Sequence, residues 1–340
     1  MTPSVARHGG DAAEWNGVVA AAEGATHAHR FEWLAVIGDS LDHEVMPLAC
    51  RDDAGTLTGV LPLVRVRTPL FGHYLVSVPF LNYGGPLGSA GAIRALTAEA
   101  VRLGREARVK LTELRSLVEL PIDLPASHRK ITVVLDLPPE TEALWKAIPA
   151  KVRSQVRRPQ KEGVTVRFGR DQVEPFYRVF ARHMRDLGTP VLPRRLFESM
   201  AERFGDDAWF AVAWLGDQPV ACGAGVTWLG ESEIIWAASL REHNRIAPNM
   251  ALYWAAMEQA IARGCRRFNF GRCTPGSGTH RFKQQWGGRD VPLWWYQDSP
   301  RGIGATPSPD GGYGLAVRLW QRLPLAVANR LGPHIVRGIP

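Results

Sequence analysis

One order of elements, a hairpin followed by a third strand, a helix and a fourth strand, is predicted twice in this chain of 340 residues. In the first copy, Asp53 and Gly55 supply turn residues between two apolar runs, and Ser89 is a helix N-cap. In the second copy, the hairpin turns at GDQP and Gly264 ends the helix. The repeat predicts a duplicated module of the α/β (α+β) class, with mixed central sheets flanked by helices and a ligand cleft between the copies. The predicted elements cover 44–50, 57–66, 74–78, 89–107 and 109–114 in the first copy, and 209–215, 220–228, 231–239, 248–263 and 267–270 in the second.

The repeat also sets the expected domain boundaries. We expect a first domain over 1–139 and a second over 140–298, with Trp294–Tyr296 as the last strand of the second. A stretch rich in Gly, Pro and Ser over 299–312 is typical of a linker.

The segment 313–340 is predicted to be a basic amphipathic tail. It contains four arginines and one histidine but no acidic residue, and Pro324 divides it into two short helices. Such a tail either lies on an anionic membrane surface or docks on the first domain.

Charge and cysteine content narrow the expected partners and compartment. The net charge of +8 favours an anionic partner such as a nucleotide, a tRNA, a phospholipid surface or a phosphorylated carrier. The four cysteines form no CxxC pair, and no His/Cys cluster has metal-ligand spacing, so we expect reduced thiols, no metal site and a cytoplasmic chain. Neither a secretory signal pattern nor an apolar run long enough to span a bilayer occurs in the sequence.

The stretch 266–288, RRFNFGRCTPGSGTHRFKQQWGG, is predicted to form a binding loop of the second copy. It combines a short strand, a glycine-rich loop and a cationic aromatic segment that carries Phe282 and Lys283. Three glycines permit positive φ and close approach of the backbone to a ligand: Gly271, Gly276 and Gly278. An ordinary surface loop is the alternative, and Cys273 leaves a thiol nucleophile open.

The segment between the copies contains five cations in eleven residues, KVRSQVRRPQK over 151–161. Arg153 and Arg157 share one helical face, and no acidic residue is interleaved to pair with them. These two arginines are therefore candidates for binding a phosphate, and a solvated charged face is the alternative.

The order of elements and four separated motifs resemble one known group of proteins. The motifs are FGHYLVSVPFLNYGGPLG (71–88), KVRSQVRRPQKEG (151–163), MRDLGTPVLP (184–193) and FGRCTPGSGTHRFKQQWG (270–287). Together they resemble FemAB-like proteins of the GNAT acyltransferase superfamily, in the subgroup encoded with exosortase/PEP-CTERM and exopolysaccharide systems. The resemblance covers nearly the whole chain and implies two GNAT-like domains in tandem.

The resemblance also implies a reaction and a set of donor-site residues. Fem-type enzymes transfer an aminoacyl group from tRNA to an amine, and ordinary GNAT enzymes transfer an acyl group from coenzyme A; neither donor is a tightly bound cofactor. Lys283, which follows Phe282, is implied at the donor phosphate or the developing oxyanion. The further donor-site candidates are Asn249, Arg272, Gly276, Gly278 and Phe282.

Three further residues complete the predicted site. His243, in the loop before the second helix, is the best-placed general base, with a solvated loop histidine as the alternative. Asn82 and Tyr83 are predicted to face the acceptor from the first copy, beside Arg153 and Arg157; a conventional turn is the alternative for the first pair. The second copy has NRIAPNMA where an acetyl-CoA loop would carry Gln/Arg-x-x-Gly-x-Gly/Ala, which leaves tRNA or another carrier open as the donor.

The sequence and the resemblance together predict an N-acyltransferase or aminoacyltransferase. Its donor would be an acyl-CoA or an aminoacyl-tRNA, and its acceptor an amine of a nucleotide- or lipid-linked envelope or exopolysaccharide precursor. The second copy would bind the donor, at the inner face of the cytoplasmic membrane if the tail contacts lipid. The rival prediction is a non-catalytic, degenerate GNAT pair that acts as a membrane-associated scaffold for the polysaccharide machinery. A nucleic-acid-binding module is disfavoured because the basic residues lack aromatic interleaving.

Overall fold

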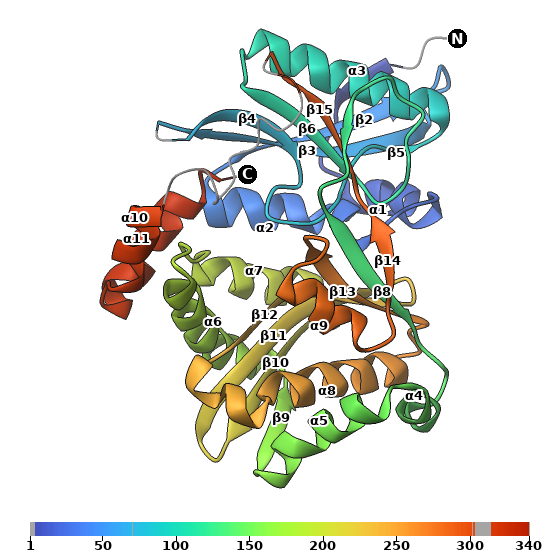
Figure 1. Cartoon of the computed structure of the whole chain (residues 1–340). Helices are drawn as coiled ribbons and strands as arrows, with labels where there is room; N and C mark the ends of the chain where they lie inside the picture. The colour runs from blue at the N-terminus through green and yellow to red at the C-terminus, as the bar shows by residue number, and fades with distance from the viewer. Residues whose placement is uncertain (1–3, 70, 301, 303–313, 340) are drawn as a thin grey trace. The chain divides into compact units, whose positions relative to one another are not determined.

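The computed structural model describes residues 4–69, 71–300, 302 and 314–339 (Figure 1). The chain divides into two compact units. Unit 1 comprises Met1–Lys130, Pro292–Gly311 and His334–Pro340, and unit 2 comprises Ile131–Val291 and Gly312–Pro333. No helix in the described part of the chain combines the length and the hydropathy that a membrane span requires.

Unit 1 is a mixed sheet with helices on its faces. The strand order is β1-β2-β3-β4-β6-β15-β7, with β5 paired to β3, and the pair β4–β6 is parallel. Helix α3 begins at the predicted cap, where Ser89 Oγ accepts a hydrogen bond from the amide of Ala92. Its apolar stripe packs on Leu61 and Leu63 of β3. The elements are β1 Ser4–Arg7, α1 Ala12–Ala21, α2 Glu32–Leu41, β2 Glu44–Arg51, β3 Leu57–Thr68, β4 Gly72–Ser77, β5 Leu87–Gly88, α3 Ala90–Glu106, β6 Leu111–Ser116, β7 Ala126–Ser127 and β15 Trp294–Asp298.

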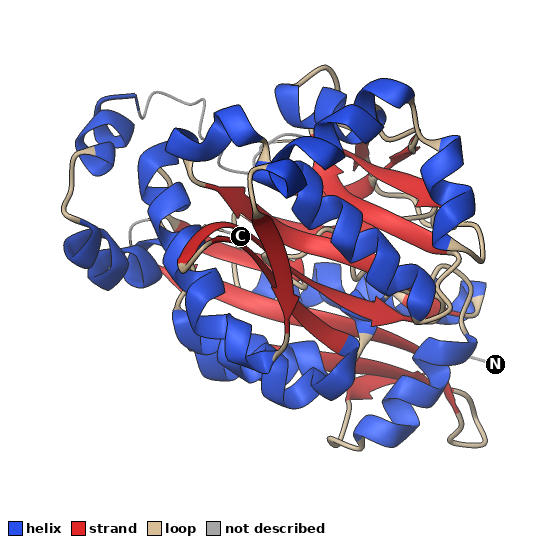
Figure 2. Cartoon of the chain, turned by 90° about the horizontal axis from the view of Figure 1, so that it is seen from below, coloured by secondary structure: helices blue, strands red, loops and turns tan. Residues whose placement is uncertain are grey.

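Unit 2 is a second mixed sheet with the strand order β14-β8-β13-β12-β11-β10-β9. Successive residues of β10 point to opposite faces. Ala211 belongs to the apolar core with α8 and α5, whereas the ring of Phe210 contacts Phe176 of α6 with centroids 5.4 Å apart. Helices α5 and α8 therefore cover one face and α6 the other, and Figure 2 shows strands enclosed between helices. The elements are β8 Ile131–Asp136, α4 Thr141–Ala147, α5 Ala150–Lys161, β9 Val164–Phe168, α6 Val173–Leu187, α7 Arg194–Phe204, β10 Ala208–Leu215, β11 Gln218–Trp228, β12 Glu231–Ser239, α8 Pro248–Ala262, β13 Arg267–Cys273, α9 Gly278–Gln284 and β14 Arg289–Pro292.

Two strands pair differently from the prediction. β8 falls within the predicted first domain but pairs with β13 in unit 2. β15, predicted to end the second domain, pairs with β6 and β7 in unit 1. The units therefore change at Lys130/Ile131 and at Val291/Pro292 instead of at 139/140 and 298. An apolar strand pattern indicates a strand but not its partner, because pairing is decided by neighbours elsewhere in the chain.

The predicted linker over 299–312 lies outside the described residues except for Ser299, Pro300 and Gly302. The predicted tail forms two helices interrupted at Pro324, which are α10 Gly314–Gln321 and α11 Leu325–Val336. All four cysteines are buried free thiols.

Candidate functional site

Strands β12 and β13 of unit 2 pair over only part of their length. Their parallel ladder runs from Glu231/Arg267 to Glu233/Asn269 and includes neither Ile234–Ser239 nor Phe270–Cys273. On its other side β12 pairs with β11, whose register shifts between Ala224 and Gly225. The bulge and the short ladder leave the second halves of β12 and β13 without backbone pairing to each other.

A pocket of about 400 Å³ lies where β12 ends and α8 begins. A 3₁₀ turn over Arg241–Ile246 connects the two, and Ala247 precedes α8 with a positive φ of 54°. The pocket therefore combines the end of β12, the first turn of α8, one residue of α5 and one side of α9. Its lining residues are Gln155, Ser239, Asn244, Ala247, Pro248, Asn249, Met250, Gly278, Arg281, Phe282 and Gln285.

Two side-chain amides in this pocket have unsatisfied oxygens. The Asn249 amide donates to Ser239 Oγ at 3.1 Å, but Asn249 Oδ1 is buried and accepts no hydrogen bond. Gln155 Oε1 on α5 is likewise buried without a partner. A buried acceptor that lacks a donor costs about 1–3 kcal/mol, so a ligand that carries N–H or O–H groups would gain by binding here.

The first turn of α8 offers few backbone donors to the pocket. Pro248, at the start of the helix, has no N–H, and the amide of Met250 already donates to the carbonyl of Ala247 at 2.9 Å. The pocket's cation is Arg281, whose Nη1 donates to the carbonyl of Gly276 at 2.7 Å. An anionic group bound here would therefore be neutralised mainly by the Arg281 guanidinium, which can form bidentate hydrogen bonds to phosphate or carboxylate.

The two predicted donor-site residues Gly278 and Phe282 line the same pocket as Asn249. Phe282 is held edge-on against Tyr253 of α8, with ring centroids 4.9 Å apart. The structure thus brings three of the predicted donor-site residues together. Arg272 lies exposed on β13, and neither it nor Gly276 is among the lining residues.

Lys283 points away from the pocket and into the protein. Its ammonium is buried and donates to the carbonyls of Gly271 and Arg272, at 2.7 and 2.9 Å. Burial lowers the pKa of Lys283 to about 8. The contacts are those of an anchor that ties α9 to the end of β13, where Gly271 adopts a positive φ of 70°. Lys283 is not among the residues that line the pocket, and its contact with a donor phosphate or oxyanion stays a prediction.

A histidine–aspartate pair that the sequence did not reveal holds the same loop. His280 Nδ1 accepts a hydrogen bond from the amide of Gly276 at 2.9 Å, and Nε2 donates to Asp290 Oδ1 at 2.9 Å. Both ring nitrogens of His280 therefore take part in hydrogen bonds, and the backbone amide of Gly276 ties the loop to this ring. Ten residues separate His280 from Asp290, and only the pairing of β14 with β8 places the carboxylate beside the ring.

The comparisons with known proteins concern the fold. Residues 150–284 match the family model described as an acetyltransferase (GNAT) domain. The solved structure of FemX superposes with a TM-score of 0.64 at 14% identity, covering 88% of this chain and 98% of that chain. A tandem GNAT protein from the clavulanic acid biosynthesis pathway gives a TM-score of 0.50 at 14% identity, covering 90% and 99%. The chain has the tandem GNAT fold.

A third structure also shares this fold. The structure of L-PGS from Bacillus licheniformis superposes on the present chain with a TM-score of 0.57 at 13% identity, covering 92% of this chain and 98% of that chain. The comparison with curated proteins yields no match. The predicted fold, two GNAT-like domains with mixed sheets and flanking helices, is confirmed.

The basic residues predicted to bind an acceptor phosphate have protein partners in the GNAT unit 2. Arg153 Nη1 donates to the carbonyl of Ile148 at 2.7 Å and caps the end of α4. The Arg157 guanidinium lies over the ring of Trp145, 5.1 Å from its centroid. Both arginines therefore have partners although no acidic residue is nearby, because backbone carbonyls bind Arg153 and an aromatic ring faces Arg157. Their binding to an acceptor stays a prediction.

His243 lies in the 3₁₀ turn before α8 but is not among the residues that line the pocket. Its Nε2 is buried without a hydrogen-bond partner. The structure thus does not place the predicted general base at the pocket, and its role stays a prediction.

Asn82 and Tyr83, the predicted acceptor residues of unit 1, are buried at 8% and 0% exposure. The carbonyl of Asn82 accepts from Trp295 Nε1 at 3.3 Å. In this structure Tyr83 therefore presents no surface to a solvent-filled cleft, in contrast to the prediction. Gly84 and Gly85 explain why the loop is so close to β6: a Cβ on Gly85 would come within 2.8 Å of the Arg115 carbonyl.

A buried ion pair underlies that loop in unit 1. Arg115 Nε donates to Glu113 Oε1 at 2.8 Å, and Gln297 Nε2 donates to Glu113 Oε2 at 2.7 Å. The Arg115 side chain also donates to the carbonyl of Leu81 at 3.1 Å and lies over the ring of Trp295. The pair fixes the loop that holds Asn82 and Tyr83. Sequence analysis did not predict it, because the groups that bury and satisfy it, Gln297 and the Leu81 carbonyl, come from distant segments.

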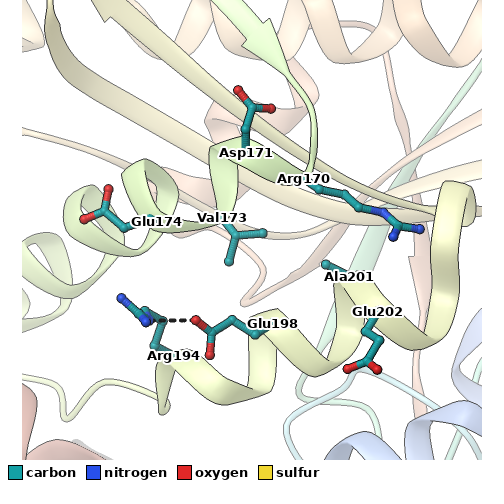
Figure 3. A pocket seen from close by; sticks show the side chains of 8 residues that line it. All are labelled: Arg170, Asp171, Val173, Glu174, Arg194, Glu198, Ala201 and Glu202. Atoms are coloured by element: carbon teal, nitrogen blue, oxygen red, sulfur yellow. Dashed lines mark ion pairs between the residues drawn. The ribbon is translucent and has the colours of Figure 1, made fainter.

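A second hollow in unit 2, of about 510 Å³, is lined mainly by charged side chains (Figure 3). Arg194 pairs with Glu198 at 2.9 Å along α7, and Glu174 pairs with Arg178 along α6 at 2.8 Å. These two pairs neutralise their charges within their own helices, so Glu174, Arg194 and Glu198 offer no unpaired charge to a ligand. Its lining residues are Arg170, Asp171, Val173, Glu174, Arg194, Glu198, Ala201 and Glu202.

Proposed function

We propose that this protein is an N-acyltransferase or aminoacyltransferase whose activated donor binds in the pocket between β12, α8 and α9. The observation that carries the proposal is the pocket itself. It lies at the end of β12, past the point where β12 stops pairing with β13, contains two unsatisfied amide oxygens and has one arginine on its wall. The fold supports the assignment because acyl transfer is the activity named for the matching domain family.

The proposed reaction needs no covalent enzyme intermediate. The lone pair of a neutral amine on the acceptor attacks the acyl carbonyl carbon of the donor, and the carbon–sulfur or carbon–oxygen bond to the carrier breaks. The proton lost by the amine passes to the departing thiolate or alkoxide, directly or through water. The protein contributes by holding the donor and by stabilising the negative charge that develops on the carbonyl oxygen.

The residues of the pocket would divide this work. Arg281 binds an anionic part of the donor. Asn249 and Gln155 accept hydrogen bonds from N–H or O–H groups of the donor, which could be the amide groups of a pantetheine arm or the free amine of an aminoacyl group. Because α8 supplies few backbone N–H groups, the pocket favours a donor held through side chains over one whose pyrophosphate relies on helix amides.

The acceptor in this proposal is an amine on an anionic nucleotide- or lipid-linked saccharide precursor. The support is the net charge of +8 and the motifs that resemble exosortase- and exopolysaccharide-associated FemAB-like proteins. FemX and L-PGS share the fold with this chain but little of its sequence. Their substrates therefore suggest which acceptors to assay and do not identify the acceptor of this protein.

Donor binding to pocket variants tests the proposal. We expect acetyl-CoA, longer acyl-CoAs or aminoacyl-tRNA to bind the wild-type protein in calorimetry and to raise its melting temperature. Arg281→Gln and Asn249→Ala should each weaken binding about tenfold, since each removes a hydrogen-bonding group worth about 1.4 kcal/mol.

Gln160→Ala is a matched control on the exposed side of α5, and Arg289→Gln is a matched control on β14. Both should bind the donor like the wild type. If a donor binds but the two pocket variants retain full affinity, the donor site lies elsewhere. If none of these donors binds at all, the non-catalytic scaffold becomes the better assignment.

A further inference from the structure

Helix α10 of the tail packs against α6 within unit 2. The contact is close, because a Cβ added to Gly188 at the end of α6 would come within 2.4 Å of Val317. Gln321 Nε2 donates to the carbonyl of Asp186 at 3.2 Å, and Arg185 Nη1 donates to the carbonyl of Leu323 at 2.9 Å. Docking of the tail on the first domain is one of the two predicted alternatives, and for α10 it is wrong because this helix packs on α6 of unit 2.

The face of α10 that turns away from α6 combines large apolar side chains with cations. At 100° per residue, Leu315, Arg318 and Leu319 fall within an arc of about 100°, opposite the docked residue Val317, and the exposed Arg322 follows in the turn after the helix. Leu315 is 69% exposed and Leu319 is 58% exposed. Both leucines are therefore largely open to solvent in the described part of the chain.

Helix α11 has the same construction. Ala328 and Gly332 are buried on its inner side. Val327 and Leu331 are exposed, and they share one arc of the helix with Arg330 and His334. The two helices thus carry matching outward faces, each with two apolar and two basic residues.

The charge of the tail indicates what would cover these faces. The sequence over 311–340 contains no aspartate or glutamate, so its arginines have no acidic partner on their own helices. A helix face that is merely solvated usually carries charges of both signs and has few large apolar residues. Exposed leucines bordered by arginines are instead the pattern of a helix that lies in a membrane interface, where the apolar groups enter the acyl region and the cations contact anionic headgroups.

We propose that the outward faces of α10 and α11 form a docking surface for an anionic phospholipid membrane. The surface comprises Leu315, Arg318, Leu319, Arg322, Val327, Arg330 and Leu331. The inference goes beyond the proposed transferase function and depends on none of the pocket residues.

Vesicle flotation with the full-length protein tests this surface. We expect the protein to float with vesicles made of equal parts phosphatidylglycerol and phosphatidylcholine, to bind phosphatidylcholine vesicles weakly, and to dissociate as salt is raised. Arg318→Gln with Arg322→Gln should reduce the partition coefficient roughly thirtyfold. Leu315→Ser with Leu319→Ser should reduce it about tenfold or more.

Two matched controls separate this surface from general stickiness. Leu229→Ser changes an equally exposed leucine in the turn between β11 and β12, and Arg158→Gln with Lys161→Gln removes two exposed cations of α5. Both controls should float like the wild type, and every variant should keep the wild-type circular dichroism spectrum and donor affinity.

Three results would overturn the proposal. The first is equal binding to vesicles with and without phosphatidylglycerol. The second is unchanged flotation of the α10 variants. The third is a dimer in sedimentation that the Leu315/Leu319 variant dissociates, which would assign the faces to a second copy of this chain.

Discussion

Acidification should destabilise unit 1 through His29, a buried histidine in the turn before α2. His29 Nδ1 accepts a hydrogen bond from the amide of Thr26 at 3.1 Å, and the ring also bonds to the backbone of Gly85 in the loop that holds Tyr83. Burial lowers the pKa of His29 to about 3. Between about pH 3 and about pH 6.5 the folded protein therefore keeps this ring neutral, whereas the unfolded chain protonates it.

The size of the effect follows from the difference in proton binding between the two states. In the unfolded chain a histidine has a pKa of about 6.5, so the stability linked to His29 is fully present above that pH and is lost as the pH falls below it. Each pH unit costs about 1.4 kcal/mol, so at about pH 5 the loss from His29 is about 2 kcal/mol. His43, whose pKa burial lowers to about 4, adds a similar amount. Together they remove about 4 kcal/mol, a large share of the 5–15 kcal/mol that stabilises a typical domain.

Urea unfolding at neutral pH and at about pH 5 measures this loss, and His29→Asn isolates the contribution of one ring. The asparagine oxygen can accept from the Thr26 amide as Nδ1 does but cannot protonate, so the variant should be less stable at neutral pH and lose about 2 kcal/mol of the pH dependence. His334→Asn, at an exposed position of α11, should keep the wild-type profile. An identical pH dependence in His29→Asn and the wild type would refute the reasoning.

Two further predictions concern unit 2. Gly225→Ala should lower the free energy of unfolding in urea by about 3 kcal/mol, because the new Cβ would lie 1.9 Å from the Glu233 carbonyl oxygen and 2.5 Å from Trp209. The control Gly91→Ala on α3 meets no atom within 4 Å and should cost nothing. An equal, small effect of both substitutions would contradict this packing. Lys283→Met should speed amide hydrogen exchange across 272–279 at least tenfold, because the carbonyls of Gly271 and Arg272 lose their buried donor; unchanged exchange in mass spectrometry would return Lys283 to a role at the donor.

Local sequence signals predicted the elements well, because their causes lie within a few residues. Ser89 caps α3, and Asp52 at the β2–β3 turn accepts hydrogen bonds from the amides of Ala54 and Thr56, which folds the predicted hairpin. The motif that carries Gly278 and Phe282 could be placed at the pocket because it follows β13 directly. Gln155 and Arg281 were missed because only the packing of α5 and α9 near α8 turns them into pocket residues.

The direction of a long side chain was beyond what the sequence could predict. Lys283 occupies the position that the resemblance implies, yet its ammonium turns inward to two backbone carbonyls. The charge pattern predicts that Arg153 and Arg157 are unpaired because no acidic residue is near them in the sequence, whereas a helix end and a tryptophan ring engage them in the structure. In each case the partner is a backbone or aromatic group that no charge pattern reports.

The placement of β15 has a consequence for how the protein is made. β15 lies between β6 and β7 in the sheet of unit 1, but it follows the main segment of unit 2 in the chain. On the ribosome, residues 1–130 therefore emerge with a gap in their sheet that stays open until residue 298 has left the exit tunnel. During that interval the edges of β6 and β7 are unpaired and open to other chains, a hazard for aggregation that a fold of two consecutive segments would avoid. The same order means that no cut at a single point of the sequence yields two fragments that can each complete a sheet.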